Sequence, residues 1–195
     1  MRILFASHNP NKVKEVQAML GAGFELVSLT DIGLHEDIPE TGSTLEENAK
    51  IKAEHVFAKT KLPVFADDTG LEVEALSGAP GVYSARYAGS EKSDAKNMAK
   101  LLRELEGKPN RKAQFRTVFH FINSEGEAKV IEGKVEGEIL NSIRGEKGFG
   151  YDPIFLPEGK NQSFAEMSRE AKNEISHRGR ALRKLVEYLR SSQGA

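Results

Sequence analysis

Apolar residues recur along the chain in patterns that are typical of buried strands and of amphipathic helices. The run from Arg2 to Ala6 is wholly apolar after its first residue, which predicts a buried strand. Apolar residues then recur at helical spacing, at Val13, Val16, Met19 and Leu20. Because asparagine is a good N-cap, the pattern predicts a helix that begins near Asn11. The chain is therefore expected to open with a strand, a loop and a helix.

A second helix is predicted from about Thr44 to Lys59. Residues 43–46 have the form of a capping box, and one apolar stripe follows: Leu45, Ala49, Ala53, Val56 and Phe57. The next apolar run, from Pro63 to Ala66, predicts another buried strand. Asp67 to Gly70 has the composition of a turn and is expected to end that strand.

The second half of the chain contains two long runs rich in β-branched and aromatic residues. They extend from Gln114 to Asn123 and from Lys129 to Leu140, and the intervening Ser124 to Glu127 is typical of a turn. We expect an antiparallel hairpin there. A last helix is predicted after the cap Ser176, with a buried face of Ala181, Leu182, Leu185, Val186 and Leu189. These elements together predict an α/β protein whose mixed sheet carries helices on its faces.

Composition narrows the functional classes. The 195 residues are 38% hydrophobic and 29% charged, and 28 basic against 29 acidic side chains give a net charge of −1. This balance argues against binding of nucleic acid through bulk electrostatics but is compatible with a small charged substrate. The absence of cysteine excludes disulfides, thiolate metal sites and cysteine catalysis. No repeat or linker-like tract divides the chain, so we predict one domain over residues 1–195.

The N-terminal apolar run is short. It ends at polar Ser7, too early for the core of a signal peptide or for a membrane span. We therefore expect a soluble, cytoplasmic protein that does not enter a membrane.

The loop between the first strand and the first helix is a candidate phosphate site. Ser7, Asn9 and Lys12 lie where free backbone N–H groups and the helix dipole attract an anion. The glycines of a P-loop are missing, so Lys12 is expected to act as a point charge beside side-chain donors. The alternative is an ordinary turn with an exposed lysine.

An acidic cluster is the second candidate. Asp67 and Asp68 follow a buried strand, at the edge where open α/β sheets place ligands, and Glu40 precedes the second helix. Two or three converging carboxylates suit Mg²⁺, which takes oxygen ligands and shares them with substrate phosphates. The alternative is a solvated turn.

The triplet Asp68-Thr69-Gly70 also occurs in aspartic proteases, which use paired carboxylates. The chain has one such triplet, it is preceded by charged Asp67, and the predicted amphipathic helices contradict an all-β protease. This alternative is therefore disfavoured.

A glycine-rich segment, Gly148 to Pro153, is the third candidate. Glycines on both sides of Phe149 allow a backbone to approach a ligand, and Phe149 or Tyr151 offers a face on which a base can stack. The alternative is a turn with one aromatic side chain in the core. His177 and Arg178 lie in the first turn of the last helix, where His177 could equally be a surface residue.

Taken together, these segments and one other, Gly78 to Arg86, resemble one family. They occur in a single order: Ser7 to Lys12, Glu40 to Ala49, Ala66 to Leu71, Gly78 to Arg86, Gly148 to Pro153 and Ile175 to Gly179. In this the chain resembles the Ham1/RdgB family, the inosine triphosphate pyrophosphatases, over essentially its whole length.

The resemblance implies an activity and an architecture. The implied reaction is hydrolysis of non-standard purine nucleoside triphosphates, ITP, dITP and XTP, to the monophosphate and pyrophosphate with Mg²⁺ as cofactor. The implied fold is an elongated mixed β-sheet flanked by helices, with two lobes around a central cleft. The implied assembly is a homodimer.

The resemblance also implies roles for particular residues. Phosphates are expected at Ser7, His8, Asn9, Pro10, Asn11 and Lys12, with Lys52 as a further candidate. Glu40 and Asp68 are the implied metal ligands, Asp68 is also the proton acceptor, and Thr69 is a substrate contact. The base is expected to contact Phe149, Gly150, Tyr151, Asp152, His177 and Arg178, and Lys172 is a further implied substrate contact.

Two chemical expectations follow. Crowding of Asp68 with Asp67 and Glu40 should raise its pKa and make it a better base. Arg178 can donate to the carbonyl at the purine six-position of hypoxanthine or xanthine but cannot accept from the amino group of adenine. A catalytically silent nucleotide-binding protein with the same residues is the alternative from another class.

Overall fold

A computed structural model describes residues 1–192 and contains one mixed sheet. Its strands are β1 (Arg2–Phe5), β2 (Glu25–Ser28), β3 (Val64–Val73), β4 (Pro80–Gly81), β5 (Lys112–Ile122), β6 (Ala128–Ile139) and β7 (Phe155–Pro157). The order is β2-β1-β3-β5-β6-β7, and β4 also pairs with β3. β1 runs parallel to β2 and β3, whereas β4 is antiparallel to β3 and β7 to β6. The predicted α/β class with a mixed sheet is confirmed.

Residue contacts divide the chain into two compact units. Unit 1 comprises, of the described residues, 1–68, 117–133 and 178–192, and unit 2 comprises residues 69–116 and 134–177. Each of the strands β3, β5 and β6 contributes residues to both units. The chain passes between the units within these three strands and once more at the start of the helix His177–Ser192, which explains why its sequence contains no linker-like tract.

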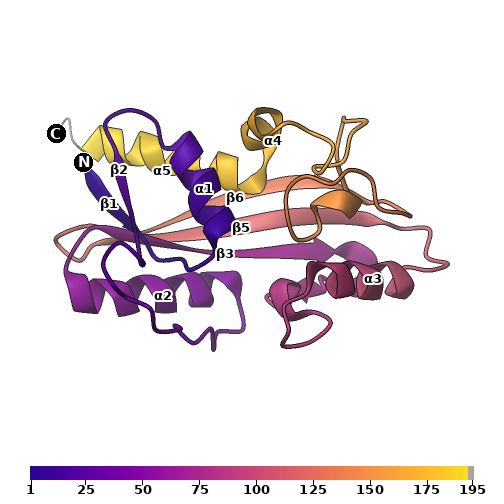
Figure 1. The fold of residues 1–195 in the computed structure, drawn as a ribbon, viewed down its shortest axis with the longest axis horizontal. Coiled ribbons are helices and arrows are strands. Elements are labelled where there is room, and N and C mark those ends of the chain that lie inside the picture. Colours follow the sequence, from indigo (N-terminus) through magenta and orange to yellow (C-terminus); the bar gives the residue numbers. More distant parts are fainter. Residues whose placement is uncertain (193–195) are drawn as a thin grey trace. The chain divides into compact units, whose positions relative to one another are not determined.

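Unit 1 has helices on both faces of its strands. Figure 1 shows α2 (Leu45–Thr60) on one side and α1 (Pro10–Met19) with α5 (His177–Ser192) on the other. Successive side chains of a strand point to opposite faces. Ile3 and Phe5 accordingly pack with α1 and α5, whereas Leu4 packs with α2. The predicted apolar face of α5 is confirmed, because Ala181, Leu182, Leu185 and Leu189 are buried in the first of these clusters.

Unit 2 has a separate core around Phe115. Its ring packs edge-on against Phe155 at a centroid distance of 4.7 Å. The unit contains α3 (Asp94–Glu104), α4 (Arg169–Ile175) and three short 3₁₀ turns, Glu74–Leu76, Ser84–Arg86 and Asp152–Ile154. The sequence pattern did not predict α3, which Ser93 caps and which buries Met98 and Leu101. No helix within residues 1–192 combines the length and the apolar character needed to cross a membrane.

The starts of the first two predicted helices are displaced, whereas α5 begins directly after Ser176 as predicted. Asn9, not Asn11, caps α1, and its side chain accepts from the backbone N–H groups of Asn11 and Lys12. Thr44 caps α2 by accepting from Glu47 N, so the capping interaction lies one residue later than predicted. A helix begins at the side chain that reaches the free N–H groups, and several neighbouring polar residues in each segment compete for that role.

β3 does not end at Asp67, and the prediction of a turn there is wrong. The strand continues through Asp67 and Asp68 to Val73. Buried carboxylates are tolerated inside a strand when partners satisfy them, and both aspartates have partners from the helices described below.

Candidate functional site

The two aspartates of β3 point to opposite faces because side chains alternate along a strand. Asp67 follows Phe65 by two residues and shares its face, toward α1 and α5. Asp68 follows Ala66 by two residues and shares its face, toward α2. The two consecutive carboxylates therefore have different neighbours, and their pKa values are shifted in opposite directions.

Asp67 belongs to a buried ionic network within unit 1. Lys12 Nζ lies 2.8 Å and Arg178 Nη2 3.5 Å from Asp67 Oδ2, and Arg178 Nη1 pairs with Glu15. The side chains of Asp67 and Arg178 are 1% and 2% exposed. Burial opposes ionisation of Asp67, but Lys12 and Arg178 hold its pKa well below the usual range. Burial lowers the pKa of Lys12, although the nearby negative charge of Asp67 acts to raise it.

Asp68 belongs to a second network on the α2 side. Asn48 Nδ2 donates to Asp68 Oδ2 at 3.0 Å. Lys52 Nζ lies 2.6 Å from Glu40 Oε1 and 3.9 Å from Asp68 Oδ1, so one ammonium group contacts both carboxylates. Burial raises the pKa of Asp68, and the negative charge of Glu40 raises it further. The positive charges of Lys52 and Lys12 oppose this rise but do not cancel it. The expected rise is confirmed, but Asp67, which points to the other face, is not among its main causes.

The predicted phosphate loop is internally hydrogen-bonded. Asn9 Oδ1 accepts from Asn11 N at 2.9 Å and from Lys12 N at 3.3 Å, and Val13 N donates to Asn9 O. The N–H groups expected to be free for an anion are therefore occupied by the cap. His8 Nε2 lies 3.0 Å from the carbonyl oxygen of Glu36. The Lys12 ammonium is the cationic group that this loop contributes.

Unit 2 contains a buried ion pair between Asp152 and Lys172. Lys172 Nζ lies 2.7 Å from Asp152 Oδ2, which also accepts from Phe149 N at 2.9 Å. A Cβ added to Gly148, which has a φ of +78°, would collide with this carboxylate, so the close approach requires glycine. Gly150 N donates to the carboxylate of Asp94 at 2.7 Å. The segment 148–152 is thus held by charged side chains at two points.

The aromatic rings of this segment differ in accessibility. Tyr151 is buried, and its hydroxyl donates to Ser84 O at 2.8 Å. Phe149 is half-buried, and Lys172 Nζ lies 5.0 Å from its ring centroid. The geometry therefore favours Phe149 over Tyr151 as the ring on which a base could stack.

His177 and Arg178 are adjacent in the sequence but have different partners. The ring of His177 is buried in unit 2 and stacks on Phe115 at 4.7 Å with an interplanar angle of 17°. The alternative of a surface histidine is therefore wrong. Arg178 contributes to the network of Asp67 in unit 1, and its predicted role in reading the base stays a prediction. Thr69 is half-buried within β3.

Two residues of these networks were not predicted as site residues, Glu15 and Asn48. Glu15 follows Lys12 by three residues on α1, and Asn48 precedes Lys52 by four on α2. Residues at these spacings share a helix face. Both residues could therefore have been found from the sequence by examining the polar residues one helical turn from Lys12 and Lys52.

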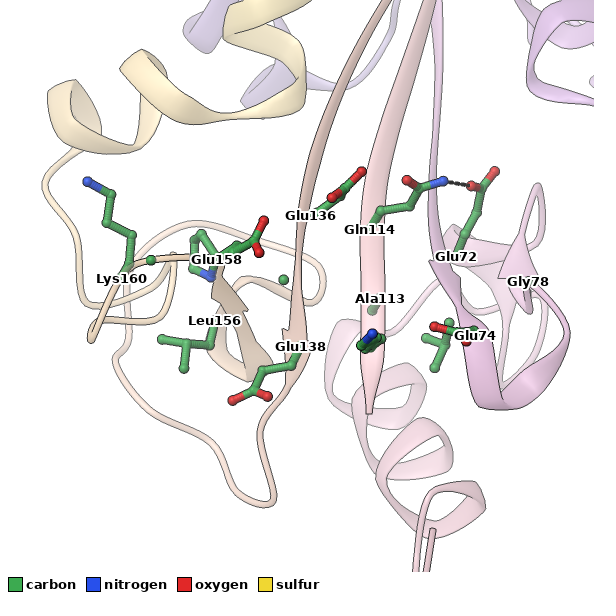
Figure 2. A pocket seen from close by; sticks show the side chains of 15 residues that line it. Glu72, Glu74, Gly78, Ala113, Gln114, Glu136, Glu138, Leu156, Glu158 and Lys160 are labelled. Carbon is green, nitrogen blue, oxygen red and sulfur yellow. Dashed lines mark hydrogen bonds between the residues drawn. The ribbon is translucent and has the colours of Figure 1, made fainter. Parts of the chain in front are cut away.

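A hollow of about 710 Å³ lies on the sheet of unit 2, away from the predicted site residues of the described chain. Figure 2 shows Gln114 of β5 between Glu136 of β6 and Glu72 of β3, and the amide of Gln114 donates to Glu72 at 2.7 Å. Its lining is acidic: Glu72, Glu74, Glu136, Glu138 and Glu158, against Lys112 and Lys160. Such a surface repels a triphosphate, so this hollow does not fit a nucleotide.

Comparisons with known proteins place these residues in a family context. The Ham1 family model matches residues 3–188. The chain is 54% identical to a dITP/XTP pyrophosphatase of Christiangramia forsetii, with 97% of this chain and 99% of the relative covered. It is 51% identical to a dITP/XTP pyrophosphatase of Flavobacterium psychrophilum, with 98% and 100% covered.

A solved structure agrees with the fold. The Ham1 protein of Staphylococcus aureus superposes with a TM-score of 0.90 at 41% sequence identity, with 98% of this chain and 100% of that chain covered. The likeness extends over nearly the whole chain.

Proposed function

Because the chain belongs to the Ham1 family, we propose that it hydrolyses non-standard purine nucleoside triphosphates, ITP, dITP and XTP, to the monophosphate and pyrophosphate. The observation that carries the proposal is the buried Asp68, held next to Glu40 and Lys52 on one face of unit 1. An ionisable carboxylate with a raised pKa beside a second carboxylate and a cation suits hydrolysis of a phosphoanhydride.

Glu40 and Asp68 are suited to bind Mg²⁺. Both carboxylates lie within reach of one ammonium group, so both can face one cation. Within residues 1–192 no three His, Cys, Asp or Glu side chains converge into a metal cage. This fits Mg²⁺, which is usually held by one or two carboxylates together with substrate phosphates. When bound, Mg²⁺ neutralises charge on the phosphate oxygens.

The residues of the chain then have separate tasks. Asp68 orients a water molecule toward the α-phosphorus and accepts its proton, while pyrophosphate leaves. Lys12 and Lys52 donate to phosphate oxygens and offset their charge. Asp67, which is ionised and paired with Lys12 and Arg178, holds these two cations in place. Its low pKa makes it unsuited to accept a proton.

Unit 2 would bind the base. The ring of Phe149 stacks on the purine, and Asp152 with Lys172 supplies an acceptor and a donor. The pair is buried, so a base whose donors and acceptors do not match these two groups is disfavoured. We retain the proposals that Arg178 reads the six-position, that the protein is a cytoplasmic homodimer and that residues 1–195 form one domain.

Incubation of the protein with ITP, dITP, XTP or ATP and Mg²⁺, followed by detection of pyrophosphate, tests the proposed function. We expect pyrophosphate from the first three and little from ATP. Absence of pyrophosphate from all of them, with nucleotide binding retained, would favour the catalytically silent binding protein. Release of orthophosphate instead would indicate a phosphatase.

Phe149→Leu should weaken substrate binding without disabling the phosphate chemistry. Loss of a stacking partner costs about 1–3 kcal/mol per base. This corresponds to a KM for ITP raised about 5- to 150-fold, whereas kcat should change little. Steady-state kinetics with ITP measure both constants. Phe57→Leu on α2, where Lys61 contacts the ring, is a matched control and should leave KM unchanged. A larger change in kcat than in KM would place Phe149 in the chemical step.

A further inference from the structure

We infer that Asn48 is a positioning residue that fixes the spacing of the two metal-binding carboxylates, an inference that rests on the proposed function. Asn48 lies on α2 and its side chain is fully buried. Nδ2 donates to Asp68 Oδ2 at 3.0 Å, and Oδ1 accepts from Gly42 N at 2.8 Å. One amide thus joins the strand that carries Asp68 to the segment that carries Glu40.

Lys52 makes a second connection between the same two segments, one helical turn along α2. Its ammonium group contacts Glu40 Oε1 at 2.6 Å and Asp68 Oδ1 at 3.9 Å. A bound divalent cation competes with this ammonium group for the carboxylates. The amide of Asn48 is neutral and contacts the other oxygen of Asp68, so its two hydrogen bonds are compatible with a bound cation. Asn48 is therefore the connection that persists when metal binds.

The packing around Gly42 leaves this connection little freedom. A Cβ added to Gly42 would lie 2.8 Å from Asn48 Oδ1 and 2.6 Å from Glu47 Cβ. Contacts this short require something to move, so a side chain at Gly42 pushes the Asn48 amide away. The hydrogen bond to Asp68 Oδ2 also restricts the rotation of that carboxylate, whose Oδ1 lies 3.9 Å from the Lys52 ammonium that contacts Glu40.

Asn48→Ala tests the inference in the full-length protein. Removal of a group that orients metal ligands typically lowers metal affinity or activity about 10- to 100-fold. We expect kcat for ITP to fall by this factor and the Mg²⁺ concentration for half-maximal rate to rise about 10-fold. KM for ITP at saturating Mg²⁺ should stay within about threefold, because other residues bind the nucleotide. Gly42→Ala should cause a smaller change in the same direction.

Direct metal binding is measured alongside activity. Titration with Mn²⁺, followed by electron paramagnetic resonance, should give a dissociation constant about 10-fold higher for Asn48→Ala than for the parent protein. Asn97→Ala is the matched control, because Asn97 is also a buried helix residue whose amide holds backbone groups, of Ser84, Ala85 and Ala88. It should lower the melting temperature comparably and leave the Mn²⁺ constant unchanged.

The outcomes separate this inference from the proposed function. If Asn48→Ala lowers the melting temperature but leaves the Mn²⁺ constant and kcat within about threefold of the parent values, Asn48 is a structural residue only and the inference is wrong. If the parent protein releases no pyrophosphate from ITP while Mn²⁺ binding still weakens in Asn48→Ala and not in Asn97→Ala, the positioning role stands and the proposed function fails.

Discussion

Asp68→Asn is expected to reduce kcat for ITP by about 1,000-fold or more, because a positioned general base alone contributes about 10²- to 10⁴-fold. The amide cannot accept the proton of the attacking water, and it removes one of the two carboxylates proposed to bind Mg²⁺. Shape and volume are nearly unchanged, so ITP should still bind. Pyrophosphate release measures turnover, and equilibrium binding of a non-hydrolysable ITP analogue measures binding.

Asp31→Asn is the matched control for this substitution. Asp31 lies in unit 1, and its carboxylate accepts from the backbone N–H and the hydroxyl of Ser28 at an exposed turn. The same chemical change should leave kcat close to that of the parent protein. Retention of most of the activity by Asp68→Asn would show that another group accepts the proton.

Asp67→Asn should cause the largest loss of stability. Asp67 is fully buried and compensates the charges of Lys12 and Arg178, so a neutral amide removes the carboxylate that pairs with Lys12 and leaves Arg178 with the carboxylate of Glu15. Breaking a buried ion pair by removing one partner costs about 3–5 kcal/mol. Urea-induced unfolding at pH 7 measures the loss.

The pH dependence of this loss has a defined sign. The pKa of Asp67 is lower in the folded protein than in the unfolded chain. Ionised Asp67 therefore contributes its full stabilisation above the unfolded pKa, about 3.9, and the contribution is lost as pH falls through the folded value. The difference between Asp67→Asn and the parent protein should be largest near neutral pH and should narrow in acid.

Glu91→Gln is the control for stability. Its carboxylate pairs with Lys96, and both side chains are more than half exposed, so the pair contributes little. Equal losses for Asp67→Asn and Glu91→Gln, or a loss at Asp67 that does not vary with pH, would contradict the assigned role of Asp67.

The elements that the sequence predicted well are those with long apolar periodicity. The strand at Arg2 and the helices of 45–60 and 177–192 all occur. The hairpin of β5 and β6 also occurs, because the two strands are neighbours in the sheet and hydrogen bonds join Asn123 N to Glu127 O and Ile139 N to Arg111 O. Their periodic patterns reflect burial of whole faces, which local sequence expresses directly. The starts of α1 and α2 were displaced because several polar residues in each segment can cap. β3 was cut short because Asp67 to Gly70 has a turn composition, and only long-range partners make that composition stable inside a sheet.

The sequence by itself determined the family and the α/β class, because these depend on residue types in a given order, and it predicted the site residues apart from Glu15 and Asn48. Only the tertiary structure decided which charged side chains form ion pairs with each other. Arg178 pairs with Glu15, 163 positions away, and with Asp67, 111 positions away. Because side chains alternate along a strand, Asp67 faces α1 and α5, whereas Asp68 faces α2. Spacing along the chain does not specify such partners, since ionic pairing and burial depend on distances in space.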